Sequence, residues 1–340
     1  MIMKLLVTGC CGFIGTNFVR MMLASHPDWR ITNLDKLTYA GNRQNLLDFE
    51  RDEPRYTFVQ GDIGDRELVS GLMEGTSFDA VVNFAAESHV DRSINDPVPF
   101  VTTNVLGTQN ILGCAHRAGI PRFVQVSTDE VYGSLGPEGA FHEAMPLAPN
   151  SPYSASKASA DLIARAYFET YGMPVVITRC SNNYGPYQFP EKLIPLMYLS
   201  AYADKPLPVY GNGMNVRDWI WVEDHCRGVE LALLKGRDGI VYNFGGHAEM
   251  PNIEVVRAIL HILGKPESLV SFVKDRPGHD LRYAMDFSLA AEELGFAPTL
   301  DFQKGLEKTI AWYRDNADWV EQVQSGEYRT FMDSWYGERE

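Results

Sequence analysis

The sequence predicts an α/β fold in which a doubly wound parallel sheet is joined to a smaller, mostly α/β lobe. Short apolar segments alternate with helical patterns over the first half of the chain. Such alternation is typical of βαβ units, whose helices cover both faces of a parallel sheet. A glycine-rich turn follows the first apolar segment, and beyond about residue 180 a stretch rich in polar, aromatic, proline and glycine residues begins. That change of pattern favours a second lobe.

The first βα unit is predicted at the start of the chain. Residues 4–9 read as a buried strand, and the motif Gly9-x-x-Gly12-x-x-Gly15 turns this strand into a helix that ends near residue 25. Glycines at these positions let the backbone approach a pyrophosphate, which then lies at the positive end of the helix dipole. A glycine-rich turn without a ligand is the alternative. The motif therefore predicts a Rossmann-type, dinucleotide-binding unit.

Asp35 indicates which dinucleotide is bound. It follows a second predicted strand, residues 31–34, and lies the usual distance of about twenty residues beyond the glycine motif. A carboxylate at this position binds both ribose hydroxyls of NAD and repels the 2′-phosphate of NADP. The prediction is NAD, and Lys36, beside Asp35, is the feature that points the other way.

Further strands are predicted at residues 56–60, 79–84, 122–127 and 174–179. Polar residues follow these strands, and in an open parallel sheet the ligand binds beyond the carboxyl ends of the strands. Any one polar group could cap a loop, but together they predict a site at this edge of the sheet. The groups are Asp62, Ala85 to His89, Thr128 to Glu130, and Ser181 to Asn183.

Tyr153 and Lys157 predict the chemistry of that site. They are four residues apart, so on a helix they share one face. The ammonium is expected to stabilise a phenolate and to lower the pKa of Tyr153 from its usual value of about 10. A phenol so tuned can act as a general base. Amphipathic helices often carry such a pair at a solvated edge, so the prediction depends on the neighbouring Thr128, Asp129 and Glu130.

Composition limits the other functions. A formal net charge of −14 without a basic block argues against nucleic acid or an anionic membrane as partner. The chain has no apolar run of about eighteen residues and no charged-then-apolar leader, which predicts a cytoplasmic protein. The five cysteines form no C-x-x-C pair, so neither disulfides nor a metal site is expected.

The second lobe is predicted from the changed pattern. Residues 193–203 look helical and residues 206–213 read as a loop. Segments at 216–222 and 240–244 are expected to return to the large sheet. The predicted division is a Rossmann domain at 1–180, to which 216–250 returns, and a substrate-binding lobe made of 181–215 and 251–340.

From residue 4 to about residue 335 the chain resembles the extended short-chain dehydrogenase/reductase superfamily and, within it, the dTDP-glucose 4,6-dehydratases. The glycine motif and the Tyr153–Lys157 pair are typical of the whole superfamily. The epimerases of the superfamily lack the Asp129-Glu130 pair, so that pair carries the functional prediction. The narrower resemblance depends on longer motifs at residues 35–42, 85–93, 127–133, 182–186, 215–219 and 276–280.

The resemblance implies dehydration of dTDP-glucose to a 4-keto-6-deoxy sugar nucleotide, with bound NAD. Oxidation at C4 makes the C5 proton acidic, water is eliminated between C5 and C6, and the hydride returns to C6. In this scheme Tyr153 takes the C4 hydroxyl proton, Thr128 hydrogen-bonds that oxygen, and Lys157 holds the phenolate and the nicotinamide ribose. Glu130 then removes the C5 proton, and Asp129 protonates the departing C6 hydroxyl.

The two carboxyls have opposite tasks, because Asp129 must be protonated while Glu130 is ionised. Burial and mutual repulsion should push their pKa values apart. Adjacent residues on a regular strand face opposite ways, so the strand must end or bend at this pair for both carboxyls to reach one sugar.

The resemblance also implies binding residues, position by position. Arg217 is the best candidate for the diphosphate, because a guanidinium presents paired donors to phosphate oxygens. The implied cofactor contacts are Gly9, Gly12, Phe13, Ile14, Gly15, Asp35, Lys36, Leu37, Thr38, Asp62, Ile63, Phe84, Ala85, Ala86, Glu87, Thr103, Tyr153, Lys157 and Asn183. The implied substrate contacts are Ser88, Thr128, Asn182, Lys192, Leu193, Pro208, Val209, Tyr210, Arg217, Asn252, Arg276 and His279.

One departure from the family and several alternatives stand beside this reading. The family usually has Gly-Gly-Ala-Gly where this chain has Gly9-Cys10-Cys11-Gly12, and a buried cysteine can replace a small apolar residue there. UDP- or CDP-glucose as substrate, a redox 4-epimerase, and a non-catalytic sugar-nucleotide binder stay open. The resemblance further implies a role in deoxysugar biosynthesis, such as the dTDP-rhamnose pathway. It also implies a homodimer that pairs through helices near residues 97–117 and 154–171.

Overall fold

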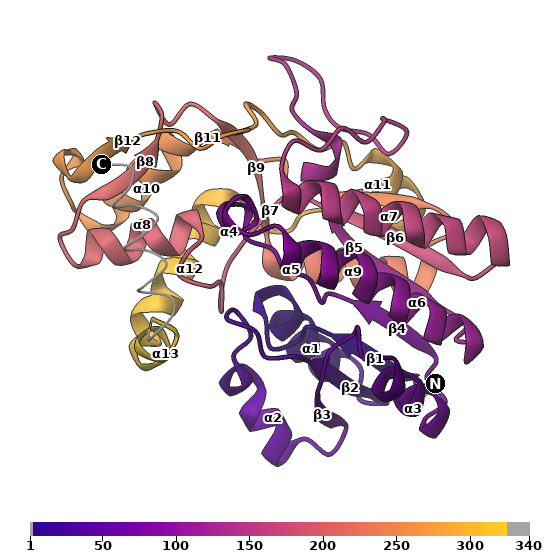
Figure 1. Ribbon diagram of the computed structural model, residues 1–340. Helices are drawn as coiled ribbons and strands as arrows, with labels where there is room; N and C mark the ends of the chain where they lie inside the picture. The colour runs from indigo at the N-terminus through magenta and orange to yellow at the C-terminus, as the bar shows by residue number, and fades with distance from the viewer. Residues whose placement is uncertain (1–2, 325–340) are drawn as a thin grey trace.

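The computed structural model describes residues 3–324 (Figure 1). Residues 1–2 and 325–340, and with them the end of the predicted lobe at 251–340, lie outside the described part. A seven-stranded sheet, in the order β10-β6-β5-β4-β1-β2-β3, pairs its strands in parallel throughout and confirms the predicted doubly wound α/β fold. Its strands are β1 Met3–Thr8, β2 Trp29–Asp35, β3 Tyr56–Gln60, β4 Ala80–Asn83, β5 Phe123–Thr128, β6 Val175–Cys180 and β10 Val241–Phe244.

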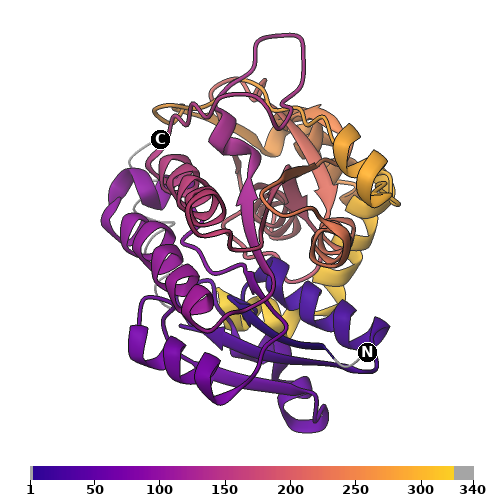
Figure 2. The same ribbon diagram turned by 90° about the vertical axis from the view of Figure 1, so that its right-hand side faces the viewer.

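Helices cover both faces of this sheet (Figures 1 and 2). Because successive strand residues point to opposite faces, Leu5 packs in one core and Leu6 in another. The Leu5 core includes α1 (Phe13–Ser25) and α9 (Val222–Lys235), and the Leu6 core includes α3 (Arg66–Gly75), α6 (Thr108–Arg117) and α7 (Pro152–Tyr171). Full burial of each such leucine stabilises the fold by about 1.5–3 kcal/mol.

The order of the strands reverses between β1 and β4, which are neighbours in the sheet although β2 and β3 lie between them in sequence. Ligands of open parallel sheets bind beyond the carboxyl ends of the strands at such a point. After β4 the chain continues through α4 (Val90–Asn95), α5 (Val98–Phe100) and the π-helical segment η2 (Val101–Gly107). Two shorter elements, η1 (Arg43–Leu46) and α2 (Leu47–Asp52), connect β2 to β3.

The smaller lobe has its own core, in which Tyr184, Trp219 and Phe302 pack together. It lies at the upper left of Figure 1 and contains two small sheets, with strand orders β11-β9-β7 and β12-β8. Its strands are β7 Asn182–Tyr184, β8 Leu207–Tyr210, β9 Val216–Trp221, β11 Glu249–Pro251 and β12 Val270–Val273. Besides α9, the helices after β6 are α8 Leu193–Tyr202, α10 Asn252–Leu263, the short η4 Glu267–Leu269, α11 Ser288–Leu294, α12 Phe302–Asp315 and α13 Ala317–Val323. Of these, α11 packs against β6 and β10 of the large sheet.

Two predictions for this region were wrong. The strand Val216–Trp221 does not return to the large sheet, because it pairs with β7 and β11, and the Asp218 carboxylate accepts the backbone N–H groups of Gly246 (3.0 Å) and Ala248 (2.7 Å). Of the segment 216–250, α9 packs on the large sheet and β10 pairs within it. The expected loop at 206–213 contains the strand β8, where Pro208 is tolerated because the sheet has only two strands and therefore only edges.

Within residues 3–324, every helix is too short or too polar to span a bilayer. The same part of the chain holds no group of three or more histidine, cysteine or acidic side chains that could bind a metal ion. All five cysteines are buried and unpaired.

Candidate active site

One cavity lies at the carboxyl ends of β1, β2, β4, β5 and β6 and extends to Phe189, Glu191 and Lys192 beside the smaller lobe. Its walls bring together the glycine turn, Asp35, the Thr128-Asp129-Glu130 group and the Tyr153–Lys157 pair. All residues predicted at the cofactor line it except Leu37, whose backbone N–H instead donates to the Asp35 carboxylate at 2.8 Å. Of the residues predicted at the substrate, Ser88, Thr128, Asn182 and Lys192 line it.

The glycine turn forms a cradle that a side chain would fill. Gly9 has φ +72°, and a Cβ atom there would lie 2.8 Å from the backbone nitrogen of Ala85. A Cβ atom on Gly15 would lie 2.6 Å from Cys10 Cα. No side chain caps the first turn of α1, so its backbone N–H groups have no side-chain acceptor and can bind an anion. The turn therefore fits the pyrophosphate of a dinucleotide.

Asp35 is buried and holds this turn in place. Its carboxylate accepts the backbone N–H of Cys11 and of Leu37, each at 2.8 Å. Burial raises the pKa of Asp35, and the two backbone hydrogen bonds oppose that rise. The ammonium of Lys36 is 2.8 Å from an Asp62 carboxylate oxygen, so its charge is paired beside Asp35.

The strand β5 ends at Thr128, where the 3₁₀ helix η3 (Asp129–Tyr132) begins. The Thr128 hydroxyl accepts the backbone N–H of Glu130 at 3.3 Å and donates to Asp129 Oδ1 at 3.1 Å. This N-cap turns the backbone, so both carboxyl residues line the cavity rather than opposite faces of a strand. The bend that the adjacent acids require is present.

The environments of the two carboxyls differ. Asp129 is 2% exposed, and its Oδ2 has no hydrogen-bond partner within residues 3–324. Burial, followed by the charge of Glu130, raises the pKa of Asp129 well above its usual range. Burial also raises the pKa of Glu130, but the positive charges of Arg276, Arg217 and Lys192 oppose that rise. The arrangement keeps a proton on Asp129 more strongly than on Glu130.

Tyr153 and Lys157 lie in the first turns of α7. Ser151 caps this helix through reciprocal hydrogen bonds with Ser154, and Pro152 occupies its first position. The expected lowering of the pKa of Tyr153 was wrong: burial and then the charge of Glu130 raise it well above its usual value. Lys157 Nζ donates to the carbonyl oxygen of Val126 at 2.7 Å.

Cations gather on the substrate side. Lys192 Nζ donates to the carbonyl oxygen of Ser88 at 3.0 Å. The Arg217 guanidinium is buried 4.1 Å from the centre of the Tyr283 ring, and it donates to the carbonyl oxygen of Asp280 at 3.0 Å. The remaining residues predicted at the substrate do not line the cavity itself, namely Leu193, Pro208, Val209, Tyr210, Arg217, Asn252, Arg276 and His279.

Sequence reasoning missed several residues at the cavity. Glu191 lines it and accepts hydrogen bonds from Tyr39 Oη (3.0 Å) and Arg92 Nε (3.2 Å). The ring of His225 lies behind the wall with Nδ1 2.9 Å from Asn183 Oδ1, and because burial lowers the pKa of His225 to about 3, the ring is neutral and Nδ1 donates. Both contacts join residues far apart in sequence, so no local motif could reveal them. The other unpredicted wall residues are Leu34, Ala40, Gly41, Gly61, Val126, Ser127, Cys180, Gln188 and Phe189.

Comparison with known proteins gives consistent matches. Residues 6–309 match the family described as GDP-mannose 4,6 dehydratase. A dTDP-glucose 4,6-dehydratase of Xanthomonas campestris is 52% identical over 342 residues, covering 95% of this chain and 97% of the relative. One from Actinoplanes is 52% identical over 322 residues, covering 93% and 99%.

Solved structures agree with the sequence relatives. The dTDP-glucose 4,6-dehydratase DesIV of Streptomyces venezuelae, with NAD and TYD bound, has a TM-score of 0.91 and 53% identity, covering 94% of this chain and 100% of its own. A UDP-glucose 4-epimerase of Thermus thermophilus, in complex with NAD, has a TM-score of 0.85 and 30% identity, covering 92% and 100%.

Proposed function

Because the chain belongs to the dTDP-glucose 4,6-dehydratase family, we propose that it converts dTDP-glucose into dTDP-4-keto-6-deoxyglucose. The enzyme is a hydro-lyase and uses NAD. The observation that carries the proposal is the meeting of Asp129, Glu130 and Tyr153 in one buried cavity with the glycine turn. A redox epimerase would have no use for Asp129, a buried carboxyl whose Oδ2 has no partner among the described residues and whose pKa is raised by burial.

The residues of the cavity suit NAD. The glycine turn would hold the pyrophosphate, and Asp35 would accept the ribose hydroxyls while it anchors the turn. His225 fixes the amide of Asn183, which we expect near the nicotinamide. When bound, NAD supplies the hydride acceptor for C4 and the hydride donor for C6.

The chain's own groups move the protons. We assign to Tyr153 the removal of the C4 hydroxyl proton. Thr128 would hydrogen-bond the same oxygen, and Lys157 would hold the phenolate. We assign removal of the C5 proton to Glu130, because nearby cations oppose the rise that burial causes in its pKa and so favour its ionised form. Asp129 then donates its proton to the C6 oxygen, so that water leaves, and burial keeps that proton in place until it is needed.

Turnover of sugar nucleotides tests this function. The purified protein with dTDP-glucose should give a 4-keto-6-deoxy product, detected by its alkali-induced absorbance, and dTDP-glucose should be preferred to UDP- and CDP-glucose. Asp129→Asn combined with Glu130→Gln should remove the product and is the control for contaminating activity. Product from UDP- or CDP-glucose alone would correct the base preference, and no product from any of the three would contradict the dehydratase assignment.

We propose that the protein is a homodimer that pairs through α5, η2, α6 and α7. Exposed apolar side chains on these elements support this, since Val98 is 66%, Leu106 59% and Leu162 57% exposed. Leu106→Arg with Leu162→Arg is expected to convert the dimer into a monomer, because two desolvated charges in an apolar interface cannot be paired. Sedimentation equilibrium measures the change, and Leu234→Arg on the exposed surface of α9 is the matched control. A wild-type protein that sediments as a monomer would refute the proposal.

We further propose the division at 1–180 with 216–250 and at 181–215 with 251–340, with three exceptions. The strands β9 and β11 belong with the smaller lobe, and α11 belongs with the large sheet, because it packs against β6 and β10. Limited proteolysis should cut first between these units.

The cytoplasm is the proposed compartment, since all five thiols are unpaired. Detection of the protein in a secreted fraction would contradict that compartment.

A further inference from the structure

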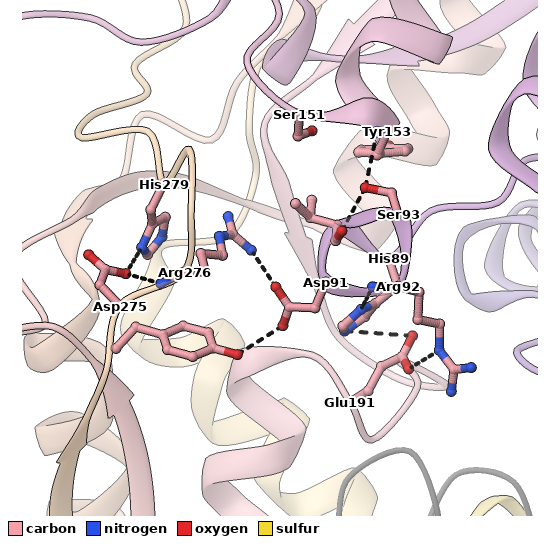
Figure 3. A network of polar contacts seen from close by, with 12 residues as sticks. His89, Asp91, Arg92, Ser93, Ser151, Tyr153, Glu191, Asp275, Arg276 and His279 are labelled. Carbon is pink, nitrogen blue, oxygen red and sulfur yellow. Dashed lines mark hydrogen bonds and ion pairs between the residues drawn. The ribbon is translucent and has the colours of Figure 1, made fainter. Parts of the chain in front are cut away.

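A network of polar contacts joins the two lobes through the short helix α4 (Figure 3). Asp91 Oδ2 accepts a hydrogen bond from Tyr210 Oη at 2.9 Å, and Asp91 Oδ1 is 3.4 Å from a guanidinium nitrogen of Arg276. Tyr210 ends β8 and Arg276 follows β12, so both partners belong to the smaller lobe, whereas α4 follows β4 of the large sheet. One carboxylate thus holds two residues of the opposite lobe.

The same helix contacts the first turn of α7. Ser93 Oγ accepts the backbone N–H of Tyr153 at 3.2 Å and donates to the carbonyl oxygen of Val90 at 2.6 Å. Arg92 in the first turn of α4 and His89, its N-cap, lie against Glu191 on the cavity wall, as Figure 3 shows. A displacement of α4 would therefore change the position of both Tyr153 and Glu191.

Asp91 is 4% exposed, so its contacts with Tyr210 and Arg276 are largely shielded from solvent. Burial alone would lower the pKa of Arg276, but the negative charges of Asp91 and Glu130 raise it, so the guanidinium stays charged. Arg276 Nε has no hydrogen-bond partner within the described residues. Because a guanidinium carries five N–H donors, Arg276 retains donors for an anion while Asp91 holds it.

The main chain of Arg276 is fixed separately. Its backbone N–H donates to Asp275 Oδ1 at 2.8 Å, and the same oxygen lies 2.6 Å from His279 Nδ1. The side chain is long and flexible, so main-chain contacts alone do not orient its guanidinium. The contact with Asp91 supplies that orientation from the other lobe.

We propose that Asp91 is a positioning residue, which holds the Arg276 guanidinium and the Tyr210 phenol where they meet the nucleoside diphosphate of the substrate. This inference rests on the proposed function, since it assumes that Arg276 and Tyr210 lie at the nucleotide. Asp91 itself touches no reacting atom and acts through its two partners. Its loss should weaken nucleotide binding and leave the chemical step nearly intact.

A double-mutant cycle on the full-length protein with its NAD tests this role. Asp91→Asn keeps the size and one acceptor but removes the charge. We expect it to raise the Kd of dTDP, measured by calorimetry, and the KM of dTDP-glucose about tenfold, with kcat within about threefold of the wild type. In an Arg276→Gln background, Asp91→Asn should change the Kd by less than about twofold, because the charged partner is already gone and the amide oxygen can still accept a hydrogen bond from Tyr210.

The matched control is Asp96→Asn, which removes an exposed charge at the end of the same helix and should alter neither constant. Equal effects of Asp91→Asn with and without Arg276, or a loss confined to kcat, would overturn the proposal. If Asp91→Asn failed to fold, a double-mutant cycle between Tyr210→Phe and Arg276→Gln would replace it, because Asp91 contacts both side chains. Coupled effects on the Kd of dTDP would support the role of Asp91, and additive effects would refute it. A wild-type protein that neither binds dTDP nor dehydrates dTDP-glucose would refute the proposed function. Additive effects of the two substitutions in an active enzyme would refute only the role of Asp91.

Discussion

Tyr153→Phe is expected to lower kcat for dTDP-glucose by about 10³- to 10⁴-fold, at the upper end of what a positioned proton-transfer group contributes. The substitution removes one oxygen from a side chain that is 8% exposed and packs edge-on against Phe100. The ring packing is kept, so the melting temperature and the bound NAD should stay unchanged. Measurement of kcat together with the NAD content of the purified protein separates loss of the base from loss of the fold.

The surroundings of Tyr153 also predict a pH dependence. Burial and the Glu130 charge raise the pKa of Tyr153, so near neutral pH its hydroxyl is mostly protonated. A group that must accept a proton gains activity as pH rises towards its pKa, and the rate of the first step should therefore increase with pH. Phenylalanine would abolish that dependence. A Tyr153→Phe enzyme with more than about a tenth of the wild-type kcat would show that another group removes the C4 hydroxyl proton.

The second large effect separates the two carboxyls. Glu130→Gln and Asp129→Asn are each expected to lower kcat by about 10²- to 10⁴-fold, but for different reasons. Without Glu130 the C5 proton should stay in place, so substrate incubated in D₂O should gain no deuterium at C5. Without the acid, Asp129→Asn should still allow exchange at C5 while water fails to leave from C6. Nuclear magnetic resonance of the recovered sugar nucleotide distinguishes the outcomes.

The wild-type pH profile should be bell-shaped because the tasks are opposite. Glu130 acts when ionised, so activity is lost as pH falls through its pKa, which burial raises above the ordinary glutamate range. Asp129 acts when protonated, so activity is lost as pH rises through its pKa, which burial and Glu130 raise well above the ordinary aspartate range. C5 exchange that survives in Glu130→Gln and disappears in Asp129→Asn would reverse the two assignments.

Local patterns were enough to predict the large sheet and most of the cavity wall. The apolar strands, the glycine turn and the polar residues after each strand all lie within short segments, and parallel strands bring their carboxyl ends to one edge. Contacts between distant segments could not be read in this way. The pairing of β9 with β7 and β11 depends on Asp218 and a loop about thirty residues later, and the link from Glu191 to Tyr39 and Arg92 spans both lobes.

The pKa of Tyr153 illustrates a further limit. Its spacing from Lys157 is a local property and was predicted, but the degree of desolvation and the position of Glu130 are properties of the folded cavity. Sequence spacing predicts that the charge of Lys157 lowers the pKa of Tyr153. Burial raises that pKa, and the size of this opposing effect depends on the folded structure.

The two thiols of the glycine turn have a practical consequence. Cys10 and Cys11 are fully buried, and burial raises the pKa of both. Oxidants and alkylating dyes attack the thiolate, so these groups should be inert while the turn is folded. Because the other three cysteines are buried as well, the native chain offers such a dye almost nothing to react with. The rate of labelling then reports unfolding directly, and the protein carries its own probe of folding stability without an engineered residue.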